Sequence, residues 1–200
     1  MLNLLYLLSV CYFSNTESAF AFRSDEFVRD SIVLPEDCSK IYQYSIKERM
    51  SRYPFSKADQ VMLISWKEPE IKAMPKDSLV LPEEVRLYQP TPIKNNRLDY
   101  PKISETATLN ANQTDKLTSI LYEYDGIAYA PMPCYSPHHA VVFLKNEEVL
   151  EFIEICFQCR AVRVSHPEEM GIKTTFCTEK YEMLRSFFQD AGIYGGFGKG

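Results

Sequence analysis

The chain has 200 residues, a net charge of −5 and 46% hydrophobic residues. This length and composition fit one globular domain. A mildly acidic chain without a block of lysines and arginines lacks the electrostatic footprint of a nucleic-acid-binding protein, and no apolar run is long enough for a transmembrane helix.

The amino-terminal residues have the pattern of a signal peptide. Residues 2–13 form a short apolar run, followed by polar residues and then by Ala19-Phe20-Ala21, a small-x-small cleavage signal. No Lys or Arg precedes the run. We expect residues 1–21 to direct export to the periplasm or cell surface. A variant is a lipoprotein anchored at Cys11, and the alternative is a cytoplasmic protein with a buried amino-terminal element.

We expect residues 22–192 to form the domain. The first half of this range contains few regular elements. Residues 43–50 are compatible with a helix, and residues 60–66 (Q-V-M-L-I-S-W) form the first clear strand pattern. Prolines are dense from residue 69 to residue 101, which excludes long helices and central strands there. We expect loops in that stretch, with short edge strands at residues 78–81 and 85–88.

Two helices are predicted. The first spans residues 111–124, with Asn110 and Gln113 in a capping-box arrangement, an apolar stripe that includes Leu117 and Leu121, and Gly126 as its end. The second spans residues 178–191, with Thr178 as its cap and Gly192 as its end; its stripe is Tyr181, Leu184 and Phe188. The glycine-rich residues 193–200 are expected to be a flexible tail.

A β-hairpin is predicted between the two helices. Residues 139–144 and 149–156 are rich in branched and aromatic side chains and flank a polar turn, so Leu144 should face Val149. Extended without a bulge, this register places Cys134 opposite Cys159. With a fourth strand at residues 161–164, the sequence predicts a single α+β domain, an antiparallel sheet with two packing helices.

Part of the chain resembles a known group of proteins. The segments C-Y-x-P, A-V-V-F-L, F-I-E-I-C-F-x-C and F-C-x-x-K-Y, together with residues 56–65 and 116–122, are similar to an uncharacterised family of bacterial proteins of the Bacteroidota type. The resemblance covers roughly residues 58–193. It implies that the cysteines are kept, whereas His138 and His139 can be Arg and Asn, and it implies no activity.

Four cysteines are expected to form one cluster: Cys134, Cys156, Cys159 and Cys177. One interpretation is a structural zinc site, because C-x-x-C between strands has the spacing of a metal knuckle. In the other interpretations the protein has no cofactor. Another is a pair of disulfides, Cys134 with Cys159 and Cys156 with Cys177, favoured by an oxidising compartment. The last is a redox-active Cys156-x-x-Cys159, although no helix start activates it. Cys38, in a polar turn, is expected to stand apart.

The histidines allow two interpretations: a functional one, as a metal ligand or catalytic base, and a plainer, structural one. His139 or His138 could replace a cysteine as a zinc ligand, or His139 could act as base for Cys134. The plainer interpretation is that both are polar residues at the entrance of a strand, and that His166 is a loop residue.

The sequence favours an exported, non-catalytic structural or binding protein stabilised by the four-cysteine cluster, with an unknown partner. One alternative is a thiol-dependent enzyme that carries out thiol–disulfide exchange with Cys156 and Cys159. Another, which applies if residues 1–21 are not a signal, is an intracellular interaction or immunity-type protein.

Overall fold

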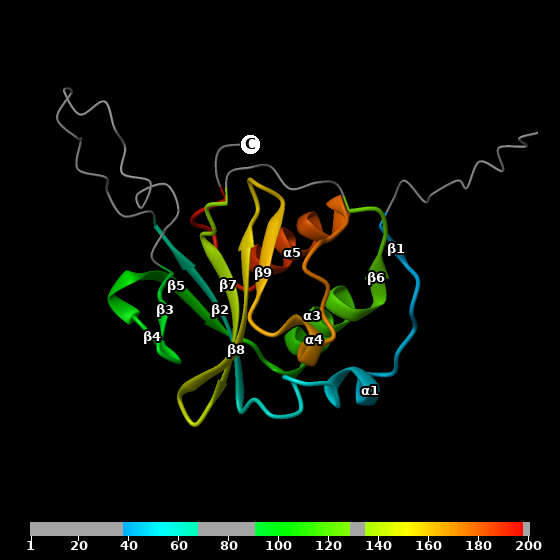
Figure 1. The fold of residues 1–200 in the computed structure, drawn as a ribbon, viewed down its shortest axis with the longest axis horizontal. Helices are drawn as coiled ribbons and strands as arrows, with labels where there is room; N and C mark the ends of the chain where they lie inside the picture. Colours follow the sequence, from blue (N-terminus) through cyan, green and yellow to red (C-terminus); the bar gives the residue numbers. More distant parts are fainter. Residues whose placement is uncertain (1–37, 68–90, 129–134, 198–200) are drawn as a thin grey trace, which may run out of the picture. The chain divides into compact units, whose positions relative to one another are not determined.

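A five-stranded antiparallel sheet, in the order β5-β2-β7-β8-β9, is the framework of the computed structural model (Figure 1). The structure describes residues 38–67, 91–128 and 135–197, all of them in one compact unit, Leu34–Gly200. The strands are β2 (Gln60–Trp66), β5 (Ile103–Thr108), β7 (His139–Lys145), β8 (Glu148–Cys156) and β9 (Ala161–Val164). The α+β class and the antiparallel sheet are thus as predicted. Residues 1–21, Cys11 and Cys134 lie outside the described part.

The hairpin of β7 and β8 is confirmed, with one change of register. Its turn is Asn146-Glu147, whose positive φ angles of 51° and 67° suit a tight hairpin turn. Leu144 faces Val149 as predicted, but Phe143 faces Glu151, so Leu150 is an extra residue. The sequence expectation assumed no bulge, and the register beyond this point is therefore displaced by one residue.

Strand β5 was not predicted. Its sequence alternates half-buried and exposed residues, the pattern of a strand with one covered face. It lies at the sheet edge beside β2, where surrounding prolines obscured the pattern. The edge strands expected at residues 78–81 and 85–88 fall outside the described residues.

Helices α3 (Ala111–Glu123) and α5 (Thr178–Asp190) cover one face of the sheet (Figure 1). Two short helices, α1 (Ile46–Met50) and α4 (Pro167–Met170), complete the helical elements of the described part, with a 3₁₀ turn at Tyr100–Lys102. The predicted stripes are buried: Leu117 and Leu184 are both 0% exposed. They join the core with Val141, Phe143 and Ile153 of the sheet.

Both long helices differ from prediction at one end. The capping box of Asn110 and Gln113 is present, but α3 stops at Glu123 because Tyr124 and Asp125 leave it as strand β6 (Tyr124–Asp125). Strand β6 pairs with β1 (Ser39–Lys40). The N-cap of α5 is Cys177 rather than Thr178.

The opposite face of the sheet carries a small second core. Met62, Ile64, Trp66 and Val142 point to this side. The hairpin of β3 (Ile93–Lys94) and β4 (Arg97–Leu98) packs against them through Ile93 and Leu98.

The carboxyl-terminal residues up to 197 are packed, which corrects the expectation of a flexible tail. Ile193 is 0% exposed and Phe197 is buried. The carboxylate of Glu105 accepts hydrogen bonds from the backbone N–H groups of Tyr194 and Gly195, at 3.2 and 2.9 Å. The glycines of this segment allow its backbone to approach Glu105 closely. The buried Ile193 and Phe197 hold the segment in place.

Candidate functional site

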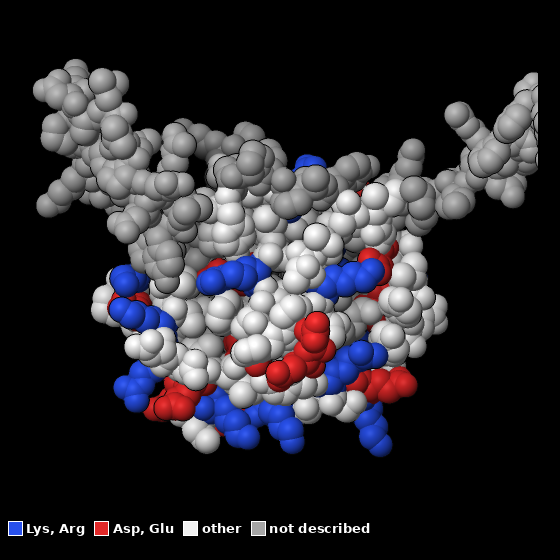
Figure 2. All heavy atoms as spheres, viewed as in Figure 1, with Lys and Arg blue, Asp and Glu red and all other residues white. Residues whose placement is uncertain are grey.

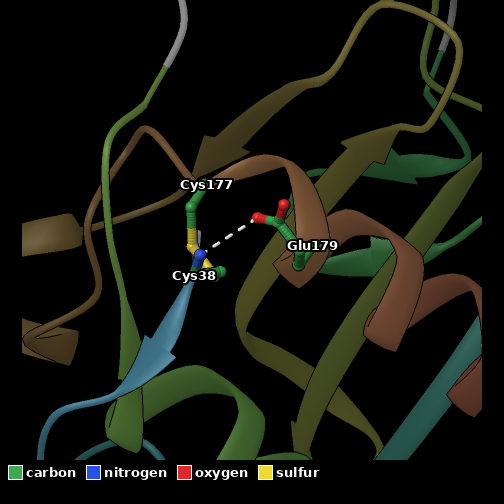
Figure 3. Close-up of side chains that lie close together, drawn as sticks. All are labelled: Cys38, Cys177 and Glu179. Carbon is green, nitrogen blue, oxygen red and sulfur yellow. Dashed lines mark hydrogen bonds between the residues drawn. A yellow bond between two sulfur atoms is a disulfide. The ribbon is translucent and has the colours of Figure 1, made fainter. Parts of the chain in front are cut away.

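A disulfide joins Cys38, next to β1, to Cys177, the N-cap of α5 (Figure 3). The two Cα atoms are 5.5 Å apart, within the range for a disulfide. The expectation that Cys38 stands apart is therefore wrong, as is the pairing of Cys156 with Cys177. The reason is that β1 pairs with β6 at the end of α3 and so brings the distant Cys38 to the start of α5.

Glu179 lies beside the Cys38–Cys177 disulfide. Its carboxylate accepts a hydrogen bond from the backbone N–H of Cys38 at 3.1 Å (Figure 3). The potential ligand atoms of Cys38, Cys177 and Glu179 lie within 4.8 Å of one another, the one such group found among the described residues. A metal binds the thiolate form of cysteine, so this group has no thiolate ligand while the disulfide is intact.

The second disulfide lies within the C-x-x-C motif, between β8 and β9. Cys156 and Cys159 have Cα atoms 5.3 Å apart, and each is 1% exposed. The backbone N–H of Cys159 points to the sulfur of Cys156 at 3.2 Å. The motif stands at a strand end in the core, without a helix start to stabilise a thiolate. The predicted pairing of Cys134 with Cys159 is therefore wrong, because Cys159 is bonded to its neighbour Cys156 across the short C-x-x-C turn. Three of the four predicted cysteines are in disulfides, and Cys134 itself lies outside the described residues.

His139 is a core residue. Its ring is 0% exposed, and its Nε2–H donates to the carbonyl of Gly195 at 2.7 Å. The ring of Phe197 stacks on it at 4.2 Å between centroids. Burial lowers the pKa of His139 to about 4, so it is neutral at physiological pH. Its Nδ1 has no hydrogen-bond partner.

His138 lies at the strand entrance, as the plainer interpretation expects. It contacts the Ser136 hydroxyl at 3.3 Å and the Trp66 carbonyl at 3.2 Å. Among the described residues, neither His138 nor His139 belongs to a group of metal-ligand atoms. Ligation or base catalysis together with Cys134 stays a prediction.

A groove of about 800 Å³ runs between α3 and α5, with β1 and α1 contributing to its wall. Its polar centre is Glu123, whose side chain is 1% exposed and pairs with Lys40 at 3.0 Å and Arg49 at 2.9 Å. Burial alone would raise the pKa of Glu123, but hydrogen bonds from Ser119, Lys40 and the Tyr44 backbone, and the charge of Arg49, lower it to about 2. Lys40 and Arg49 thus compensate the buried charge of Glu123.

A second buried carboxylate, Glu151, comes from β8, opposite Phe143 of the helix-side core. Glu151, 3% exposed, accepts hydrogen bonds from the Tyr53 hydroxyl, the Ser165 hydroxyl and Nδ1 of His166, the last at 2.9 Å. The serine donates to the glutamate and not to the histidine, so these residues do not form a nucleophile–base pair. His166 is the N-cap of α4.

Sequence reasoning missed both carboxylate clusters. Glu123 and Glu151 receive their partners from positions far away in the chain, such as Arg49 and Tyr53. The available local signal was the spacing of Ser119 and Glu123, four residues apart on one helix face.

No family model, curated protein or solved structure matches this chain. Within the part of the chain that the structure describes, no helix combines the length and apolar character needed to cross a bilayer. On the face drawn in Figure 2, basic and acidic side chains are interspersed.

Proposed function

We propose that this chain is an exported, non-catalytic binding protein whose binding surface is built around residues 38–45. The observation that carries the proposal is the Cys38–Cys177 disulfide, because the segment it fastens lines two cavities. Lys40 is in the wall of the large groove, and Tyr42 and Tyr44 are in the wall of a smaller pocket. The bond thus fixes the surface that a ligand would meet.

Export is supported by the cysteine chemistry. Disulfides persist in oxidising compartments and are rare in the cytosol. The two disulfides agree with the signal-peptide pattern of residues 1–21 and with the cell-surface or lipoprotein variants of that interpretation. Because the chain resembles bacterial proteins of the Bacteroidota type, the proposed destination of export is the periplasm or the cell surface.

Binding rather than catalysis is supported by how the buried carboxylates are used. Glu123 and Glu151 each accept several hydrogen bonds from the protein itself. Such groups serve to hold segments together. Structural zinc at the four predicted cysteines requires reduced thiols, so metal analysis of the reduced protein tests that variant.

The location is tested in native host cells. Thiols are blocked with a maleimide before lysis, the cells are fractionated, and the protein is analysed by mass spectrometry with and without reductant. We expect an amino terminus at Phe22, or a lipidated Cys11, and no label on Cys38 and Cys177 before reduction. Intact Met1 on a cytoplasmic protein with labelled thiols would favour the intracellular interaction or immunity-type alternative.

The role of the disulfide is tested by hydrogen exchange. In the Cys38→Ser/Cys177→Ser double variant, amides of residues 39–45 should exchange faster, while amides of the β7–β8 hairpin should keep their protection. Unchanged exchange at residues 39–45 would show that the disulfide does not hold this wall.

Thiol–disulfide exchange is the second candidate, and the geometry favours the Cys38–Cys177 bond over the C-x-x-C pair. Cys38 is partly exposed, whereas Cys156 and Cys159 are buried. A thiolate of an external dithiol that attacks the Cys38 sulfur would release Cys177 as a thiolate at the start of α5, where the helix dipole stabilises negative charge. The second thiol of the dithiol would then displace Cys38 and become oxidised.

An insulin-reduction assay with dithiothreitol tests this second candidate. Acceleration over dithiothreitol alone that Cys38→Ser abolishes and Cys156→Ser retains would establish exchange at this bond. A rate equal to that of dithiothreitol alone would exclude it.

A further inference from the structure

A pocket of about 190 Å³ lies at the carboxyl-terminal end of α3, beside the segment that the Cys38–Cys177 disulfide fastens. Its wall contains several tyrosine rings and three basic side chains, those of Arg52, Lys173 and Lys180. One carboxylate, Asp125, also lines it, and this carboxylate pairs with Lys173. The wall therefore has an excess of two positive charges, although the whole chain has a net charge of −5.

Arg52 has an arrangement that the fold alone does not explain. Its guanidinium lies over the rings of Tyr44 and Tyr122, at 4.4 and 5.0 Å from their centroids. Its Nε is buried and has no hydrogen-bond partner. Ring stacking occupies the faces of a guanidinium and leaves the donors in its plane for an acceptor.

Lys180 is hydrogen-bonded to one acceptor and also interacts with the charge of Asp125. It is 4% exposed, and its Nζ donates to the carbonyl of Leu121 at 3.0 Å. It also lies 4.7 Å from the centroid of the Phe176 ring. An ammonium group has three donors, and that carbonyl accepts one of them. Burial lowers the pKa of Lys180 to about 8, which reflects the cost of keeping this charge away from water.

A purely structural role accounts for part of this arrangement. Lys180 binds a carbonyl in the last turn of α3, where a cation is favourable. That role does not account for the buried, unpaired donor of Arg52. Nor does it account for the placement of Arg52 and Lys180 in the wall of one cavity, where the charge of Lys173 also acts to lower the pKa of Lys180.

We propose that this pocket binds a small oxyanion, a carboxylate or phosphate group, through Arg52 and Lys180. The planar donors of Arg52 match two oxygen atoms of such a group, and Lys180 adds a second charge from the pocket wall. The tyrosine rings would contact the organic part of the ligand. This inference rests on the proposed binding function and names the chemical class of its ligand.

The test uses the purified, oxidised protein at constant ionic strength. Sodium phosphate and sodium benzoate are titrated separately, with chloride as the competing anion, and the Arg52 Nε–H and backbone amide resonances are followed by NMR. We expect saturable shifts at Arg52 and around Lys180. Tighter phosphate binding identifies a phosphate ligand, and tighter benzoate binding identifies an aromatic carboxylate.

Matched variants separate this site from general attraction of anions. Arg52→Gln should weaken binding at least about tenfold, because it removes a charge-assisted contact of a partly buried guanidinium. Lys116→Gln, in the neighbouring groove, should leave the affinity unchanged. Arg52→Lys keeps the charge without the fork and should bind at an intermediate level, and it serves as the informative variant if Arg52→Gln does not fold.

The absence of saturable shifts with both probes, or equal affinity in the wild type and the folded Arg52 variants, would overturn the proposal. This outcome is distinguishable from failure of the proposed function. A cytoplasmic, reduced protein in cells would refute export without changing oxyanion binding by the purified protein, whereas loss of the oxyanion site would not change location or disulfide state.

Discussion

Cys38 and Cys177 are separated by 139 positions in the sequence and are joined by a disulfide that fastens β1 to the first turn of α5. Around this bond, the amide of Cys38 donates to Glu179, and Lys40 reaches the buried Glu123. One covalent link therefore fixes a segment that has little hydrophobic core of its own, since β1 is exposed throughout.

Removing this disulfide should destabilise the protein. Cross-linking such a distant pair restricts the unfolded chain strongly, so Cys38→Ser/Cys177→Ser should lower the free energy of unfolding by about 2–5 kcal/mol. The measurement is urea unfolding of the oxidised protein. The Cys156–Cys159 bond spans three positions, so its entropic contribution should be smaller. A midpoint equal to that of the wild type would contradict a stabilising role for the Cys38–Cys177 bond.

Truncating the apolar stripe of α3 should cost more than changing its exposed face. Leu121 is 5% exposed, so Leu121→Ala should lower the free energy of unfolding by about 2–5 kcal/mol, the range for deleting a buried leucine. Lys116→Ala is the control, because its side chain is 56% exposed and pairs on the surface with Asp190, and it should cost less than about 1 kcal/mol. A loss of similar size in the two variants would show that α3 is not packed on the sheet as described.

Acid should destabilise the protein through His139. Its folded pKa is lowered to about 4 by burial, whereas an unfolded histidine has a pKa of about 6.5. Between these values the unfolded chain binds more protons, so the stabilisation present above pH ~6.5 is lost as the pH falls, at up to about 1.4 kcal/mol per pH unit.

The direct check is an NMR titration of the His139 imidazole in the folded protein. We expect the neutral form to persist to a pH well below that of an ordinary histidine, because burial disfavours the charged ring. The tautomer should be Nε2–H, because the carbonyl of Gly195 accepts this proton. Titration at the usual histidine pKa would mean that the ring is not buried against Phe197.

His166 should respond to pH with the opposite sign. The hydrogen bond and the charge of Glu151 raise the pKa of His166 above its ordinary value. Its contribution to stability is therefore complete below the unfolded pKa and is lost as the pH rises through the folded pKa. In Glu151→Gln, the pKa of His166 measured by NMR should return toward the ordinary value. No change would show that the contact is not formed in solution.

Local patterns determined much of the sheet and helices. The alternating and branched residues of β7 and β8 predicted a hairpin, and the stripes of Leu117 and Leu184 predicted two buried helices. These features follow from periodicity and capping, which act over a few neighbouring residues. The same information predicted the polar turn that the structure forms at Asn146-Glu147.

The sequence did not reveal the partner of Cys177 or the bulge at Leu150. A disulfide partner is chosen by which segments the fold brings within bonding distance, and the weak pattern of β1 and β6 gave no indication of their pairing. The bulge displaced a register that the turn alone set correctly.

The sequence by itself determined four of the five strands of the main sheet, the two principal helices and the burial of their apolar faces, because those depend on local periodicity. Only the tertiary structure decided that Cys38 bonds to Cys177, that Ile193 and Phe197 anchor the carboxyl-terminal residues, and that Arg52 and Lys180 share one pocket. These contacts join segments far apart in the chain, and the physical reason for each is the proximity created by packing.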